Sequence, residues 1–228
     1  MQSRAHRVSE AYRITFVLLM IVVAWDASGL DLPLARLAAS EHGFPWRDQW
    51  LLSSVLHDAA RRVVWLLALL LCLGVWWPVG FLNRLSTSQR LQLAVTVLLA
   101  PLAVSLLKMG SHTSCPWDLK TFGGFADYTS HWSLRLDGGG GHCFPAGHAA
   151  SGFGLMGGYF AVRVSSLRSA RTWLAAGAAS GLLLGLAQQW RGAHFMSHTW
   201  WSAMVCWCVA WGIDAVWSSS GALARGLE

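Results

Sequence analysis

The chain has 228 residues, of which 54% are hydrophobic and only 12% carry a charge, and its formal net charge is +6. Soluble domains contain about 25% charged residues, so this composition argues against a soluble enzyme. The basic residues are spread between apolar segments and form no long run, which argues against a nucleic-acid-binding protein.

Six apolar segments approach the length of about 20 residues that a helix needs to cross a bilayer. In chain order they lie at residues 14–30, 63–81, 91–107, 145–164, 173–190 and 199–217. The 15 tryptophans support this interpretation, because tryptophan prefers the boundary between headgroups and acyl chains. The sequence therefore predicts an all-α polytopic membrane helix bundle of about six transmembrane helices. We expect one membrane domain, residues 1–228, with its catalytic helices at about 91–217.

Glycines recur every four residues in two of these predicted spans. They are Gly177, Gly181 and Gly185 in the fifth span, and Gly154 and Gly158 in the fourth. Such spacing allows helix backbones to approach closely in lipid, so we interpret these glycines as packing residues. The glycine run at 138–141 lies between spans and predicts a loop.

Arginines near the ends of the spans predict how the helices are oriented. One side of the membrane receives Arg4, Arg7, Arg13, Arg84, Arg90, Arg163, Arg168 and Arg171. The positive-inside rule makes that side cytoplasmic, although the opposite side carries nearly as many basic residues. We therefore expect a multi-pass protein of a bacterial inner (cytoplasmic) membrane whose outer segments, 31–62, 108–144 and 191–198, face the periplasm. The first of these segments is expected to hold a short interfacial helix near 32–39.

Three polar clusters interrupt the hydrophobic sequence, at residues 108–117, 142–148 and 188–198. All three lie on the predicted outer side. Ionisable groups at membrane depth are costly, so they are functional candidates by default. A single lysine, arginine or histidine near a helix end is more often an anchor or a capping group. The coincidence of three clusters on one face of the membrane favours a functional site.

The residue types in these clusters suit phosphoryl transfer. His148 follows Gly147 at the start of a predicted helix, where backbone N–H groups and the helix dipole favour an oxyanion. Lys108 supplies a cation, and Arg191 supplies a planar fork of donors that matches phosphate. Histidine can shuttle a proton near neutral pH. Together with His194, these groups are what transfer through a phosphohistidine requires.

A metal site is the alternative for the last cluster, because His194 and His198 stand four residues apart and could share one face of a helix. No carboxylate or third histidine stands at a convincing spacing from this pair. We therefore predict no metal and no cofactor.

The clusters resemble the motifs of the type-2 phosphatidic acid phosphatase superfamily, which are K-x6-R-P, P-S-G-H and S-R-x5-H-x3-D. The first motif resembles Lys108-x6-Cys115-Pro116, with Cys115 in place of the arginine. The second resembles Pro145-Ala146-Gly147-His148, with Ala146 in place of the serine. The order, spacing and helix placement of the motifs extend the resemblance over the last four predicted helices.

In the third motif, His194 with Gly192 and Phe195 resembles the G-x-H-[FY] core of the family. By spacing, Gln188 stands where the family has arginine, and His198 stands where it has aspartate. Two phosphate-binding arginines and the aspartate that orients the nucleophile are therefore missing.

The resemblance implies a role for each matched residue. His194 would attack phosphorus and form a phosphohistidine, and His148 would protonate the leaving oxygen. Lys108 and the backbone near Gly147 would hold the equatorial phosphate oxygens. His198, if neutral, could accept the hydrogen bond from the His194 ring that the aspartate accepts in the family.

The missing arginines leave two interpretations open, a catalytically dead protein and compensation by other cations. Arg191 lies three residues beyond Gln188, so on a helix both face the same way and Arg191 could occupy the vacated place. Further candidates precede the second span on the outer side, namely His57, Asp58, Arg61 and Arg62. For these, interfacial anchoring is the preferred interpretation.

The outer loop also carries Cys115 and Cys143, beside the first and second motifs. In an oxidising periplasm the two can form a disulfide that staples these motifs together. The alternative is a pair of free thiols.

We therefore expect a membrane phosphatase that removes phosphate from a lipid-linked phosphate or pyrophosphate at the outer face, with the bilayer and a lipid phosphate as its partners. One alternative is a phosphotransferase that moves phosphate from a polyprenyl pyrophosphate to lipid A. Another is a catalytically dead protein that binds lipid phosphate.

Overall fold

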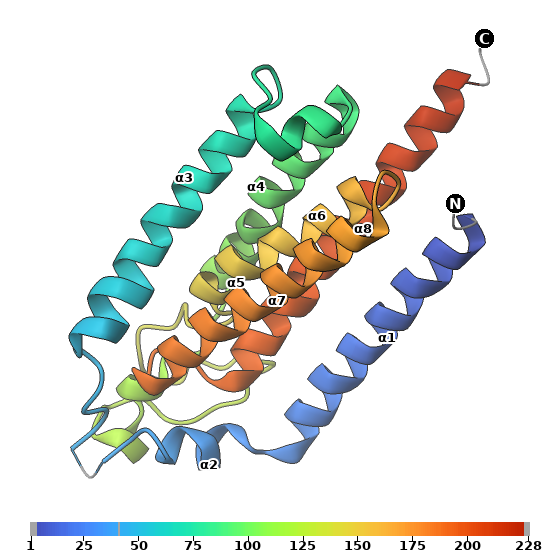
Figure 1. Ribbon diagram of the computed structural model, residues 1–228. Coiled ribbons are helices and arrows are strands. Elements are labelled where there is room, and N and C mark those ends of the chain that lie inside the picture. The colour runs from blue at the N-terminus through green and yellow to red at the C-terminus, as the bar shows by residue number, and fades with distance from the viewer. Residues whose placement is uncertain (1–3, 41, 226–228) are drawn as a thin grey trace.

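The protein is described by a computed structural model that covers residues 4–40 and 42–225, with side chains for 9–40 and 42–219. The long helices run side by side, and most loops gather at one end of the bundle (Figure 1). In chain order the elements are α1 (Arg4–Ser28), α2 (Asp31–Arg36), the π-helix η1 (Leu51–Ala59), α3 (Ala60–Leu73), η2 (Gly80–Arg84), α4 (Thr87–Met109), η3 (Pro116–Asp118), η4 (Lys120–Phe122), α5 (Gly147–Phe153), η5 (Gly154–Gly157), α6 (Gly158–Val162), α7 (Leu167–Trp190) and α8 (Met196–Arg225). The described chain contains helices and no named strand, so the predicted all-α class is confirmed.

Three of the described helices are long and apolar enough to cross a membrane, at Ser9–Ser28, Thr87–Met109 and Leu167–Trp190. The predicted number of about six is not confirmed. Over the second predicted span, α3 has only 14 residues. The fourth predicted span is divided into α5, η5 and α6, because consecutive residues there tighten into a 3-10 turn at Gly154–Gly157.

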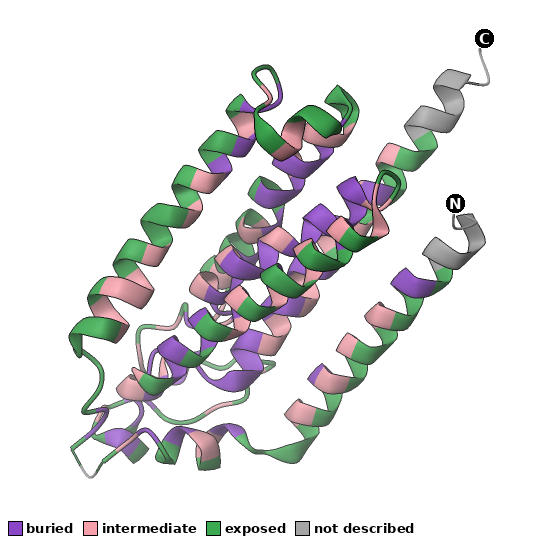
Figure 2. Ribbon diagram, viewed as in Figure 1, coloured by how far each residue is buried: buried purple, intermediate pink, exposed green. Residues whose placement is uncertain are grey.

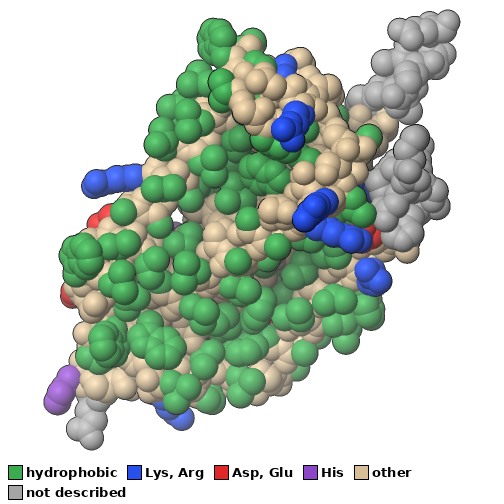
Figure 3. Space-filling view, viewed as in Figure 1, with side chains coloured by type: hydrophobic (Ala, Val, Ile, Leu, Met, Phe, Trp, Pro, Cys, Tyr) green, Lys and Arg blue, Asp and Glu red, His purple; other side chains and the backbone are tan. Residues whose placement is uncertain are grey.

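The surface of the bundle suits lipid contact. The outward faces of α1 and α3 are largely exposed (Figure 2), and they carry large apolar side chains such as Phe16, Trp65 and Leu66. Hydrophobic side chains cover much of the face shown in Figure 3. In water such a surface would be unfavourable, whereas lipid tails solvate it.

The packing of α7 depends on the predicted glycine spacing. A Cβ atom at Gly177 would lie 2.6 Å from the backbone N of Met156, and one at Gly181 would lie 2.3 Å from the Phe153 ring. A Cβ at Gly185 would lie 2.3 Å from Thr199 Cγ2 in α8. Any larger residue would push the helices apart, so the interpretation of these glycines as packing residues is confirmed.

Charged residues hold the end of the bundle that lies opposite the loops. Arg163 Nη2 lies 2.6 Å from Asp214 Oδ2, and Arg171 Nη2 lies 3.2 Å from Glu10 Oε1. These ion pairs tie α8 to the end of α6 and α1 to the first turns of α7, on either side of the turn between α6 and α7. The beginning of α1, η2 and this turn all lie at the same end (Figure 1). The side chains of Arg4 and Arg7 lie outside the described residues.

The start of α4 follows local capping chemistry. The Ser86 side chain accepts a hydrogen bond from Gln89 N at 3.2 Å, and the Gln89 side chain accepts one from Ser86 N at 3.0 Å. This reciprocal pair begins α4 four residues before the predicted span. A short helix, α2 (Asp31–Arg36), is present where one was expected near 32–39, and the glycines at 138–141 lie in a loop as predicted.

Candidate active site

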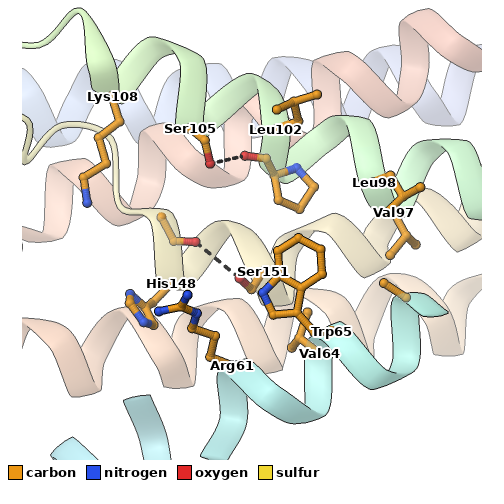
Figure 4. Close-up of a pocket in the computed structure, with 13 residues that line it drawn as sticks. Arg61, Val64, Trp65, Val97, Leu98, Leu102, Ser105, Lys108, His148 and Ser151 are labelled. Carbon is orange, nitrogen blue, oxygen red and sulfur yellow. Dashed lines mark hydrogen bonds between the residues drawn. The ribbon is translucent and has the colours of Figure 1, made fainter. Parts of the chain in front are cut away.

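The three polar clusters meet at the loop end of the bundle. Lys108 lies in the last turn of α4, Gly147 and His148 begin α5, and His194 lies in the turn between α7 and α8. A cavity of about 460 Å³ opens between α3, α4 and α5. Lys108, His148 and Arg61 line one end of it (Figure 4), and Gly147 is also part of its lining. The remaining lining is mostly apolar and comprises Val64, Trp65, Ala68, Val97, Leu98, Pro101, Leu102, Ser105 and Ser151.

His194 is held by a backbone carbonyl. Its side chain is buried, and its Nδ1 lies 2.8 Å from the carbonyl oxygen of Cys143. A carbonyl can only accept a hydrogen bond, so this contact places the proton on Nδ1 and leaves the lone pair on Nε2. Burial, together with the nearby charges of Lys108 and His148, lowers the pKa of His194 to about 3. At neutral pH the imidazole is therefore uncharged, which is the form that can attack phosphorus.

His198 was expected to orient His194, but the Cys143 carbonyl lies closer. The His198 Nδ1 is 3.4 Å from His194 Nδ1, against 2.8 Å for the carbonyl. One ring N–H makes one strong hydrogen bond, so the main acceptor for the His194 N–H is the Cys143 carbonyl oxygen and not His198. Cys143 thus contributes to the site through its backbone carbonyl, a role that its side-chain type could not indicate.

His198 itself is fully buried in the first turn of α8. The rings of Phe144 and Phe195 meet it edge-on, with centroids 5.3 and 5.5 Å away. The same turn is held by Asp31 of α2, which accepts hydrogen bonds from the backbone N and the hydroxyl of Ser197. Asp31 is a further residue that the motif pattern did not indicate.

His148 stacks on a residue from outside the three clusters. Its ring centroid lies 3.9 Å from that of His57 in η1, with 27° between the ring planes. Burial, with smaller effects from the charges of His57, Lys108, Arg61 and Arg191, lowers the pKa of His148 to about 4. At neutral pH this ring is therefore uncharged.

Arg191 and Gln188 contact each other, as their helical spacing predicts. Arg191 Nη1 donates to Gln188 Oε1 at 3.2 Å, and Arg191 Nε donates to the carbonyl oxygen of Arg47 at 2.7 Å. Neither residue lines the cavity described above. Burial lowers the pKa of Arg191. Arg191 therefore lies beside Gln188, where the family has its arginine. Its Nη2 atom makes no hydrogen bond to the described chain.

The loops are tied together by covalent and backbone links. Cys115 and Cys143 form a disulfide with their Cα atoms 5.2 Å apart. Cys143 N also donates to the carbonyl oxygen of Thr113 at 2.9 Å, and Trp117 N donates to that of Gly192 at 2.9 Å. The disulfide therefore fixes the residue whose carbonyl orients His194.

We expect Cys115 and Cys143 to resist alkylation in protein taken from an oxidising compartment, because both sulfurs are engaged with each other. Mass spectrometry after maleimide treatment without reductant measures this. Cys208, which is exposed, serves as the internal control and should label in denaturant under the same conditions. Ready labelling of both Cys115 and Cys143 in that denatured sample would contradict the pairing.

Metal-ligating side chains do not gather at the site. Within residues 9–40 and 42–219, no three His, Cys, Asp or Glu side chains lie where they could jointly hold a metal ion. His194 and His198 lack a third ligand in that part of the chain.

Comparison with known proteins gives one match. A family model described as the PAP2 superfamily matches residues 89–220, which is more than half of the chain. This range runs from the first turn of α4 into α8 and contains Lys108, His148 and His194. Neither a search of curated proteins nor one of solved structures found a match. Both η1 and α3 lie outside the matched range.

Proposed function

Because this chain belongs to the PAP2 superfamily, whose members are generally phosphatases, we propose that it removes phosphate from a lipid-linked phosphate or pyrophosphate at the outer face of a bacterial inner membrane. The observation that carries the proposal is the state of His194. Its Nδ1–H is bonded to the Cys143 carbonyl, so the uncharged ring keeps its lone pair on Nε2, and Lys108 and His148 lie near enough for their charges to act on the ring.

The reaction that fits this arrangement has two displacements. In the first, the Nε2 lone pair of His194 forms a bond to phosphorus and the bond to the lipid oxygen breaks, while His148 takes the proton that the substrate monoanion carries and passes it to that oxygen. In the second, His148 takes a proton from water, the water oxygen bonds to phosphorus, and the bond to His194 breaks. Lys108 and the backbone N–H groups near Gly147 offset the charge on the equatorial oxygens.

The cavity supports a lipid as the substrate. Its polar end is formed by Lys108, His148 and Arg61, and the apolar side chains of α3 and α4 line the rest. A phosphate group at the polar end would leave a hydrocarbon chain against Trp65 and Leu102. A water-soluble phosphate ester has no such chain to pack against these side chains, so it should be a poorer substrate.

The test is phosphate release by the purified protein in detergent. The panel is phosphatidic acid, phosphatidylglycerol phosphate, undecaprenyl pyrophosphate and lipid A, with glycerol 3-phosphate as the water-soluble control. We expect release from at least one lipid, inhibition by vanadate, and little release from the control. A labelled polyprenyl pyrophosphate with lipid A as acceptor distinguishes hydrolysis from transfer of the phosphoryl group. Absence of both release and transfer for every lipid would refute the proposal.

Arg191 is expected to serve in place of the arginine that is missing at Gln188. A charged hydrogen bond of this kind contributes about 1.5 to 3 kcal/mol, so Arg191→Ala should lower the turnover rate about ten- to a hundredfold. Arg191→Lys should recover only part of the loss, because an ammonium cannot make the bidentate contact. Steady-state kinetics of the three proteins measure this. An unchanged rate in Arg191→Ala would leave Arg191 with a purely structural role toward Arg47 and Gln188.

A further inference from the structure

The first motif lacks its arginine, and the residue at that place cannot substitute for it. Cys115 is bonded to Cys143 and carries no charge. Of the first two motifs, only Lys108 then contributes a cation to the phosphate. A phosphate monoester carries up to two negative charges, and with Arg191 assigned to the third motif the place of the first motif's arginine still lacks a cation.

A second cation reaches the cavity from a different part of the chain. Arg61, the second residue of α3, lines the same end of the cavity as Lys108 and His148. In Figure 4 its guanidinium extends toward the His148 ring, while Lys108 approaches from α4. The Arg61 side chain is exposed at this position, so a phosphate group entering the cavity can reach it. In the part of the chain that the structure describes, no carboxylate forms an ion pair with it.

The segment that carries Arg61 is docked onto the site. One helical turn earlier, His57 stacks on His148 with ring centroids 3.9 Å apart. His57 Nδ1 is in turn 2.7 Å from Asp58 Oδ1. His57 and Asp58 belong to the π-helix η1, and Arg61 follows two residues after its end. π-Helical turns are concentrated at functional sites. The stack fixes the distance between the start of α3 and the start of α5, and so places Arg61 beside His148.

We propose that Arg61 binds the phosphate group of the substrate and takes the place of the arginine that the first motif lacks. The inference rests on the proposed phosphatase function. It assigns a substrate-binding residue to a segment, η1 and the start of α3, that the family match does not include. A guanidinium can contact two phosphate oxygens at once, whereas the Lys108 ammonium acts as a point charge.

Arg62 offers a matched control. It has the same charge, lies on the same helical turn and is also exposed, but it does not line the cavity with Lys108 and His148. If Arg61 were only a membrane anchor, removing either arginine would have the same effect. The two substitutions therefore separate phosphate binding from anchoring.

Turnover is measured first, on a lipid phosphate that the wild-type protein hydrolyses. Arg61→Ala should lower kcat/KM about ten- to a hundredfold, since one charged hydrogen bond to the phosphate is lost. Arg61→Lys should recover part of this loss, and Arg62→Ala should stay within about twofold of wild type. Equal effects of Arg61→Ala and Arg62→Ala, or no effect of Arg61→Ala, would overturn the assignment.

Binding is measured second, so that the assignment can be judged without turnover. The probe is orthovanadate, and the readout is the rise in thermal unfolding temperature of the detergent-solubilised protein. The rise should be lost or greatly reduced in Arg61→Ala and kept in Arg62→Ala. A wild-type protein that binds vanadate but hydrolyses no lipid phosphate would refute the phosphatase function while leaving the role of Arg61 supported. An undiminished rise in Arg61→Ala would refute that role.

Discussion

His194→Ala is expected to lower kcat/KM for phosphate release by about a thousandfold or more, because loss of a nucleophile removes the covalent route altogether. The geometry gives the reason for choosing this residue. Its Nδ1–H is held by the Cys143 carbonyl at 2.8 Å, and no neighbouring side chain can present a lone pair from the same position. His112→Ala is the matched control, since His112 is exposed at the same end and does not line the cavity.

The intermediate provides a second and independent measurement. A phosphohistidine formed on His194 should carry label from a ³²P-labelled lipid phosphate after rapid quenching in base. The label should be absent in His194→Ala and present in His112→Ala. Full activity in His194→Ala, or label that persists in it, would contradict the mechanism.

His148→Ala is expected to produce the second large loss, about a hundred- to ten-thousandfold, which is the usual contribution of a general acid. The loss should depend on the leaving group. An alcohol leaves as a strong base and needs the proton, whereas a nitrophenolate leaves without it. The variant should therefore recover much of its activity on a nitrophenyl phosphate. An equal loss on both substrates would show that His148 acts by another route, such as phosphate binding.

The same residue predicts how the rate depends on pH. Because burial lowers the pKa of His148 to about 4, the ring gives up its proton well below neutral pH. The proton for the leaving oxygen then enters with the substrate monoanion, which loses it above about pH 6. For wild type, kcat/KM should accordingly fall as the pH rises above about 6. A rate that rises over that range would mean that the resting ring holds its own proton.

Several features of the candidate site could be predicted from the sequence because their signals are local. Lys108, His148 and His194 each belong to a short motif whose spacing is visible in the chain. The contact between Arg191 and Gln188 follows from their separation by three residues on one helix. The close packing of α7 follows from glycines at four-residue intervals. For the Arg191–Gln188 contact and the α7 glycines, the distance along the chain determines the distance in space.

The number of membrane helices was less predictable, because apolar composition does not reveal where a helix ends. The second predicted span begins at residue 63, but α3 starts at Ala60 and stops at Leu73. The fourth is interrupted by the 3-10 turn at Gly154–Gly157. Such breaks depend on what packs alongside, here Pro101 against Gly154 and Thr96 against Gly157.

Hydrophobic runs and ordered motifs by themselves determined that this protein is an all-α protein of the PAP2 superfamily with three polar clusters on one face. Only the tertiary structure decided how the incomplete motifs are supplemented. The acceptor for His194 is a backbone carbonyl, which every residue possesses and no sequence pattern marks. His57 and Arg61 reach His148 from about ninety residues earlier in the chain. Contacts between residues so far apart in the chain depend on how α3 packs against α4 and α5. Helical periodicity in the sequence carries no information about that packing.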